Sequence, residues 1–86
     1  MHRILRKRII FCIKDVSSYT GQIKENTPFS DVITNAQEFI LLLEEINSTI
    51  LKGQSKKISS NDSDKDHTSF ETVRGFILWI IPQVVE

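Results

Sequence analysis

The sequence predicts an all-α protein, either a three-helix bundle or a helical hairpin preceded by an N-terminal helix. Residues 28–52 and 69–82 each place apolar side chains three and four residues apart, which is the spacing of one helix face. Residues 3–20 fit the same spacing, and no other segment offers a partner for a β-strand. We therefore expect the 86 residues to form one small helical domain, 1–86, with marginal stability.

The first predicted helix covers residues 3–20, and Gly21 follows it as a left-handed stop. Isoleucine and phenylalanine within residues 8–14 also favour a β-strand. We prefer the helix, because a single strand would have no partner, but the strand stays open as an alternative. The stripe that this helix would bury consists of Leu5, Ile9, Cys12, Val16 and Tyr19.

The second predicted helix, residues 28–52, has matching start and stop signals. Thr27 can cap the free amides, and Pro28 suits the first helical position because its missing amide costs nothing there. Gly53 is expected to end the helix. The apolar stripe of this helix consists of Phe29, Val32, Ala36, Phe39, Leu43, Ile46 and Ile50.

Residues 53–67 are predicted to form a mobile linker, because Ile58 is the only apolar residue among them. The linker imitates the start of a calcium-binding loop with Asp62, Asp64 and Asp66. His67 stands where such a loop needs glycine, and Val73 where it needs a bidentate glutamate. We therefore predict no metal site.

The third predicted helix, residues 69–82, opens with Thr68 and Glu71, which have the spacing of a capping box. Pro82 should kink or end the helix, because proline removes an amide and clashes with the preceding turn. The apolar stripe continues through Phe70, Val73, Ile77, Ile80 and Val84.

Two apolar runs, residues 39–43 and 76–81, cover their helices on every side. A helix that is apolar all round has to be covered all round, whereas three helices in one layer leave each helix a face in water. The excess predicts a protein partner or a homo-oligomer. The expected interface consists of Phe39, Leu41, Leu42, Phe76, Leu78 and Trp79.

The charges sum to zero but are unevenly spread: the first fourteen residues contain bases and no acid, and residues 28–52 are acidic. A second hypothesis is therefore an anion-binding face on the N-terminal helix, for nucleic acid or acidic lipid. We rank it below a protein partner, because the neutral net charge gives no strongly basic field. Its residues would be Arg3, Arg6, Lys7 and Lys14.

No catalytic or cofactor motif is present in the sequence. His2 and His67 are the only histidines, and the three glycines are isolated rather than gathered in a phosphate loop. We predict that the protein is not an enzyme and needs no cofactor. The single cysteine, Cys12, excludes an internal disulfide, and the apolar run 9–13 is too short for a signal peptide. We expect an intracellular, cytoplasmic protein.

Residues 27–86, a helical hairpin with a capped second helix and a late proline, resemble helical-repeat proteins in architecture alone. A third hypothesis is therefore a fragment of a larger repeat protein, although solenoids need about three units and one is visible here. The leading hypothesis is a non-enzymatic protein–protein interaction module.

Overall fold

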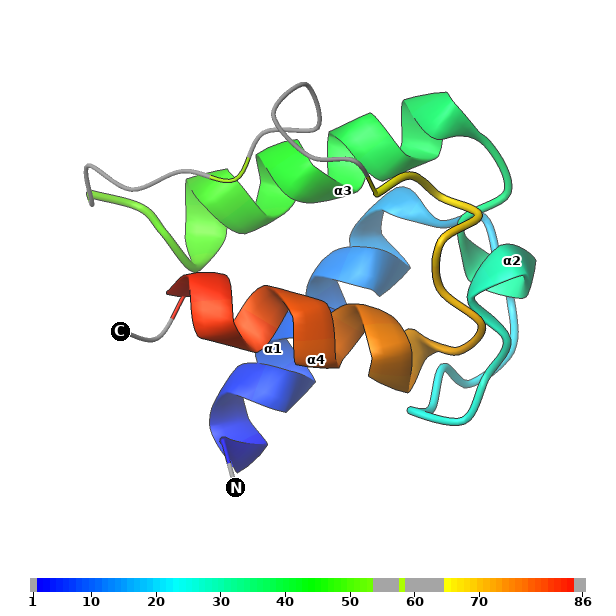
Figure 1. The fold of residues 1–86 in the computed structure, drawn as a ribbon, viewed down its shortest axis with the longest axis horizontal. Coiled ribbons are helices and arrows are strands. Elements are labelled where there is room, and N and C mark those ends of the chain that lie inside the picture. The colour runs from blue at the N-terminus through cyan, green and yellow to red at the C-terminus, as the bar shows by residue number, and fades with distance from the viewer. Residues whose placement is uncertain (1, 54–57, 59–64, 85–86) are drawn as a thin grey trace.

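The computed structural model describes residues 2–53, 58 and 65–84, and it confirms the all-α class. The described residues form four helices, rather than the three that the sequence predicts (Figure 1). Within the described residues there is no β-strand, and a single isolated bridge joins Pro28 to Thr72. The helices are α1 (Arg3–Val16), α2 (Phe29–Val32), α3 (Ala36–Thr49) and α4 (Val73–Val84).

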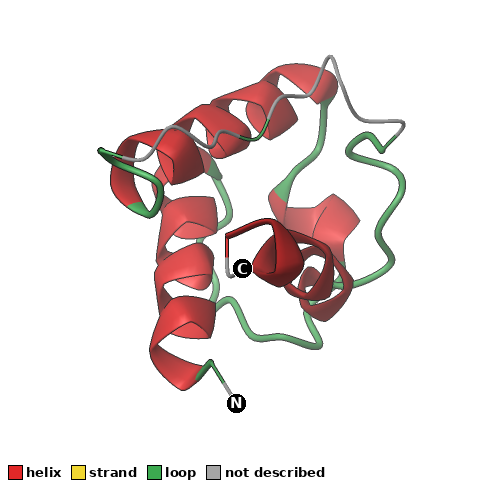
Figure 2. Ribbon diagram, turned by 60° about the vertical axis from the view of Figure 1, so that its left-hand side comes forward, coloured by secondary structure: helices red, strands yellow, loops and turns green. Residues whose placement is uncertain are grey.

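The four helices enclose one core. In Figure 1, α3 and α4 run in the same general direction, and α1 passes behind α4 toward α3. Figure 2 shows α1 along one side of the molecule and α3 across its top, with α4 beside both. Contacts of α1 with α3 and with α4 hold this arrangement together.

The prediction of one continuous helix over residues 28–52 is wrong, because the chain forms two helices there, α2 and α3. Asn35 has an extended backbone, and its Oδ1 accepts a hydrogen bond from the Glu38 amide at 2.9 Å. Glu38 Oε1 in return accepts from the Thr34 amide at 2.8 Å. These two bonds cap a new helix that starts at Ala36, separately from the helix that ends at Val32.

The first helix ends at Val16, four residues before the predicted end. Ser17 turns the backbone into an extended conformation, and its Oγ accepts from the Tyr19 amide at 3.0 Å. Serine side chains that bond nearby amides in this way compete with helix continuation. Gly21 is not left-handed and is no helix stop. Residues 8–14 lie in α1, so the helical alternative was right for them.

The last helix begins at Val73, so the predicted capping box of Thr68 and Glu71 is wrong. Thr68 instead bonds Asp66: its amide donates to Asp66 Oδ1 at 2.8 Å. Pro82 does not end the helix, which continues to Val84.

The first amides of α4 have partners in a distant segment of the chain. The Val73 amide donates to the Thr27 carbonyl at 2.9 Å, and the Arg74 amide donates to the Glu25 carbonyl at 2.8 Å. These bonds satisfy groups that a helix N-terminus leaves free.

A cluster of aromatic rings fills the centre of the core. Phe29 from α2 stacks on Phe76 from α4 with ring centroids 5.0 Å apart. Phe39 from α3 meets Phe76 edge-on at 6.0 Å, and Phe70 meets Phe29 edge-on at 5.5 Å. Such pairs add to the stability that the buried area supplies.

The predicted mobile linker falls mostly outside the described residues, since residues 54–57 and 59–64 are not among them. Ile58 is described, and its burial differs from what the prediction of a mobile linker implies at its position. Its side chain is only 5% exposed and belongs to the same core as α3 and α4.

Candidate interaction surface

Three of the six side chains predicted to face a partner lie inside the chain's own core. Phe39, Leu42 and Phe76 are buried, and they pack against the aromatic cluster and the helices around it. They are therefore not available to a partner. The prediction failed for them because α2 and the loops cover faces that a three-helix layer would leave open.

The other three predicted side chains reach the surface to different degrees. Trp79 is half-buried, and its ring stacks near Phe39 with centroids 6.4 Å apart. Leu41 on α3 is 41% exposed, and Leu78 on α4 is 49% exposed. The apolar surface that remains thus lies on two separate helices.

The largest apolar exposures among the described residues are on α1, where none was predicted. Ile4 is 76% exposed and Phe11 is 65% exposed. They lie seven residues apart and so share one stripe of the helix with Lys7 and Lys14, at spacings of three and four. We call these four residues the α1 stripe. Their heptad spacing is visible in the sequence, but it falls on the charged side of the helix.

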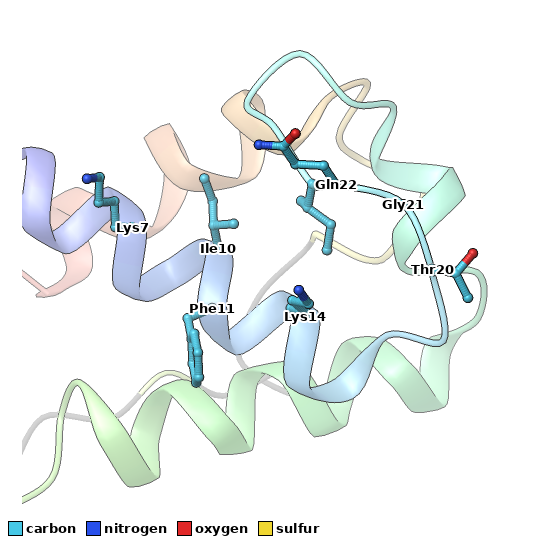
Figure 3. Close-up of a pocket in the computed structure, with 8 residues that line it drawn as sticks. Lys7, Ile10, Phe11, Lys14, Thr20, Gly21 and Gln22 are labelled. Atoms are coloured by element: carbon cyan, nitrogen blue, oxygen red, sulfur yellow. The ribbon is translucent and has the colours of Figure 1, made fainter.

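Two open hollows follow the basic side of α1. The first has a volume of about 390 Å³ and lies between Lys7, Ile10, Phe11 and Lys14 and residues 20–23, as Figure 3 shows. The second, of about 430 Å³, is lined by Arg3, Arg6, Lys7, Ile10 and Glu25. The four predicted anion-binding residues therefore lie along these two hollows.

The four bases are not equivalent. Arg6 forms an ion pair with Glu25, which ties α1 to the loop before α2. Arg3, Lys7 and Lys14 are exposed and form no ion pair among the described residues. Three cations therefore remain on this side of the molecule.

A small groove of about 120 Å³ separates α1 from α3 on the other side of Phe11. Arg8 Nη2 donates to the Thr49 carbonyl at 3.3 Å, and Cys12 Sγ lies 3.3 Å from Thr49 Oγ1. Burial raises the pKa of the Cys12 thiol above its ordinary value. A thiol with a raised pKa is a poor nucleophile, so this groove has the chemistry of a packing contact.

Two carboxyl groups meet at the same groove. A hydrogen bond with Asp15 raises the pKa of Glu45, and partial burial and the charge of Asp15 act in the same direction. The helices α1 and α3 thus bring like charges together here. The bases of the α1 stripe form no ion pair with the acids of α3 among the described residues.

The exposed side of α3 carries a second stripe. Leu41 shares it with Gln37, Glu44 and Ser48, again at spacings of three and four, and all four side chains are exposed. We call these four residues the α3 stripe. Glu44 has no ion-pair partner among the described residues.

No protein-family model, no curated protein and no solved structure matches this chain. In the described part of the chain, no group of three or more histidine, cysteine, aspartate or glutamate residues is placed to hold a metal ion. None of the helices in that part has the length and apolar character needed to cross a membrane.

Proposed function

We propose that this protein is a non-enzymatic interaction module that binds a protein partner through the α1 stripe. The observation that carries the proposal is the exposure of Ile4 and Phe11, one heptad apart on a helix whose opposite face is fully used by the core. Large apolar side chains that are exposed at regular spacing are typical of binding surfaces.

The charges on the same stripe indicate the chemistry of the partner. Lys7 and Lys14 alternate with the two apolar side chains, so a matching surface would offer apolar and acidic groups in turn. An amphipathic helix with acidic residues provides this pattern at the right spacing. An intracellular, cytoplasmic setting remains part of the proposal, because Cys12 is free.

The proposal is tested with two designed helical peptides of equal length, which carry leucine at one heptad position and either glutamate or lysine at the next. We expect the acidic peptide to shift the amide resonances of α1 in an NMR titration, and the basic peptide to leave them unchanged. Phe11→Ser should weaken binding of the acidic peptide, whereas Leu78→Ser, at an exposed apolar site on α4, should not. Equal binding of both peptides, or no binding of either, would overturn the proposal.

A second candidate function is binding to an anionic surface, and the two hollows lined by Arg3, Lys7 and Lys14 favour it. Such binding has to weaken steeply with salt, because each neutralised phosphate releases counterions. We expect no binding to duplex DNA or to vesicles of acidic phospholipid at physiological salt. Salt-sensitive binding that Lys7→Glu abolishes would favour this function over the first.

A further inference from the structure

We infer that the acidic partner of the α1 stripe is the α3 stripe of a second copy of this chain. The inference rests on the proposed function and names the partner that the proposal leaves open. The two stripes have complementary chemistry, since one alternates apolar and basic residues and the other contains Leu41 and Glu44. They also have similar lengths, about 15 Å for residues 4–14 and about 16 Å for residues 37–48 at the usual rise of a helix.

Only the antiparallel alignment of the two stripes matches their chemistry. In this alignment Lys7 lies opposite Glu44, and Phe11 lies opposite Leu41. The parallel alignment would place Lys7 opposite Leu41 and Phe11 opposite Glu44, leaving both charges against apolar groups. The antiparallel alignment sets Ile4 against Ser48 and Lys14 against Gln37, neither of which is a charge conflict.

The position of the two stripes allows both contacts to form at once. Phe11 and Glu45 line the same groove between α1 and α3, and Leu41 lies one helical turn before Glu45 on α3. Each stripe lies on the side of its helix opposite the buried residues, so the two stripes border this groove from α1 and from α3. A two-fold axis across that groove brings each α1 stripe onto the α3 stripe of the other copy, which is the symmetry of most dimers.

The charges that this dimer uses are exposed on the single chain. Lys7 and Glu44 are exposed and make no ion pair among the described residues. Association would therefore break no ion pair that the described part of the chain contains. Because the dimer has two equivalent contacts, each substitution acts twice per dimer.

The experiment is sedimentation equilibrium of the full chain across protein concentration, with the wild type and five variants. We expect the wild type to dimerise, and Lys7→Glu or Glu44→Lys to raise the dissociation constant at least about tenfold, because each places like charges opposite one another. The combination of both substitutions should restore association, since the pair is then reversed. Lys14→Glu faces an uncharged residue and should have a smaller effect, and Lys52→Glu, outside both stripes, should have none. Circular dichroism confirms that each variant is folded.

The outcomes separate this inference from the proposed function. A chain that is monomeric at all concentrations but still binds the acidic peptide would overturn the inference and leave the proposed function standing. A monomer that binds neither peptide would overturn both. A dimer that resists both charge reversals, or that the double substitution does not restore, would show that the copies meet through another surface.

Discussion

The side chain of Asn47 bonds both backbone groups of Ile58. Asn47 Nδ2 donates to the Ile58 carbonyl at 2.7 Å, and Asn47 Oδ1 accepts from the Ile58 amide at 2.9 Å. The side-chain amide of Asn47 thus pairs with the backbone of Ile58 as a neighbouring β-strand would, and it holds Ile58 against α3. The segment between α3 and α4 is therefore attached to the core at this residue.

Removal of this attachment should destabilise the fold. We expect Asn47→Ala to lower the free energy of unfolding by about 1–3 kcal/mol, because two hydrogen bonds are lost at a partly buried site. Ile58→Ala should cost about 2–5 kcal/mol, as a truncated core isoleucine does. Urea unfolding measures both, with Ser48→Ala as the exposed control on α3. If Ile58→Ala leaves stability unchanged, the segment is dispensable, as its polar composition suggests.

The break between α2 and α3 depends on the Asn35 cap. Asn35→Ala removes the acceptor for the Glu38 amide and should lower the free energy of unfolding by about 1 kcal/mol. Gln37→Ala, two residues further on, is exposed and should change it little. Thermal unfolding followed by circular dichroism makes the comparison. Equal effects of the two substitutions would show that the cap does not stabilise α3.

Adjacent leucines on α3 should respond very differently to truncation. Leu42 is fully buried, so Leu42→Ala should cost about 2–5 kcal/mol of unfolding free energy. Leu41 faces outward, so Leu41→Ala should cost less than about 0.5 kcal/mol in dilute protein. Urea unfolding at low concentration keeps self-association out of the measurement. A large loss on Leu41→Ala would place Leu41 in the core and remove it from the α3 stripe.

The Asp15–Glu45 contact predicts a dependence of stability on pH. Because this contact raises the pKa of Glu45 above its ordinary 4.5, the folded chain holds the proton to higher pH than the unfolded chain. The contribution of Glu45 to stability therefore falls as the pH rises from its pKa in the unfolded chain to its higher pKa in the folded chain. Glu45→Gln should remove this contribution and make the protein more stable at neutral pH, by less than about 1 kcal/mol because water screens the pair.

The measurement is urea unfolding of wild type and Glu45→Gln from about pH 4 to pH 7, the range in which glutamate titrates when its pKa is raised. The difference in stability between the two proteins should grow with pH in favour of the variant. Glu44→Gln serves as the control in dilute protein, where self-association does not contribute, because Glu44 has no carboxyl partner among the described residues. A difference that stays constant with pH would contradict the prediction.

Helical periodicity in the sequence identified the core better than it identified the helices. Six of the seven residues of the predicted stripe in 28–52 are buried, and only Ala36 is exposed. The stripe nevertheless spans two helices, because the cap formed by Asn35 and Glu38 competes with the start signal of Thr27 and Pro28. Periodicity indicates which side of the chain is buried, but it does not indicate which of two competing capping signals starts a helix.

The candidate surface was harder to predict for a related reason. Phe39 and Phe76 are covered by Phe29 and Phe70, whose positions depend on how the loops fold back. A count of the apolar residues on each helix by itself cannot show that side chains from other segments cover Phe39 and Phe76. Phe11 was missed because its helix already has a complete apolar face, so its exposure became apparent only when the core was assembled.

The start of α4 has a consequence for the order in which the protein folds. Its first amides find their acceptors in residues 25–27, more than forty positions earlier in the chain. Helix nucleation is the costly step, and here a distant segment supplies part of the hydrogen bonding that the first turn needs. During synthesis the acceptors leave the ribosome before α4 does, so they are present when the last helix forms. Hydrogen exchange at the Val73 and Arg74 amides should therefore require unfolding of the whole domain rather than fraying of one helix end.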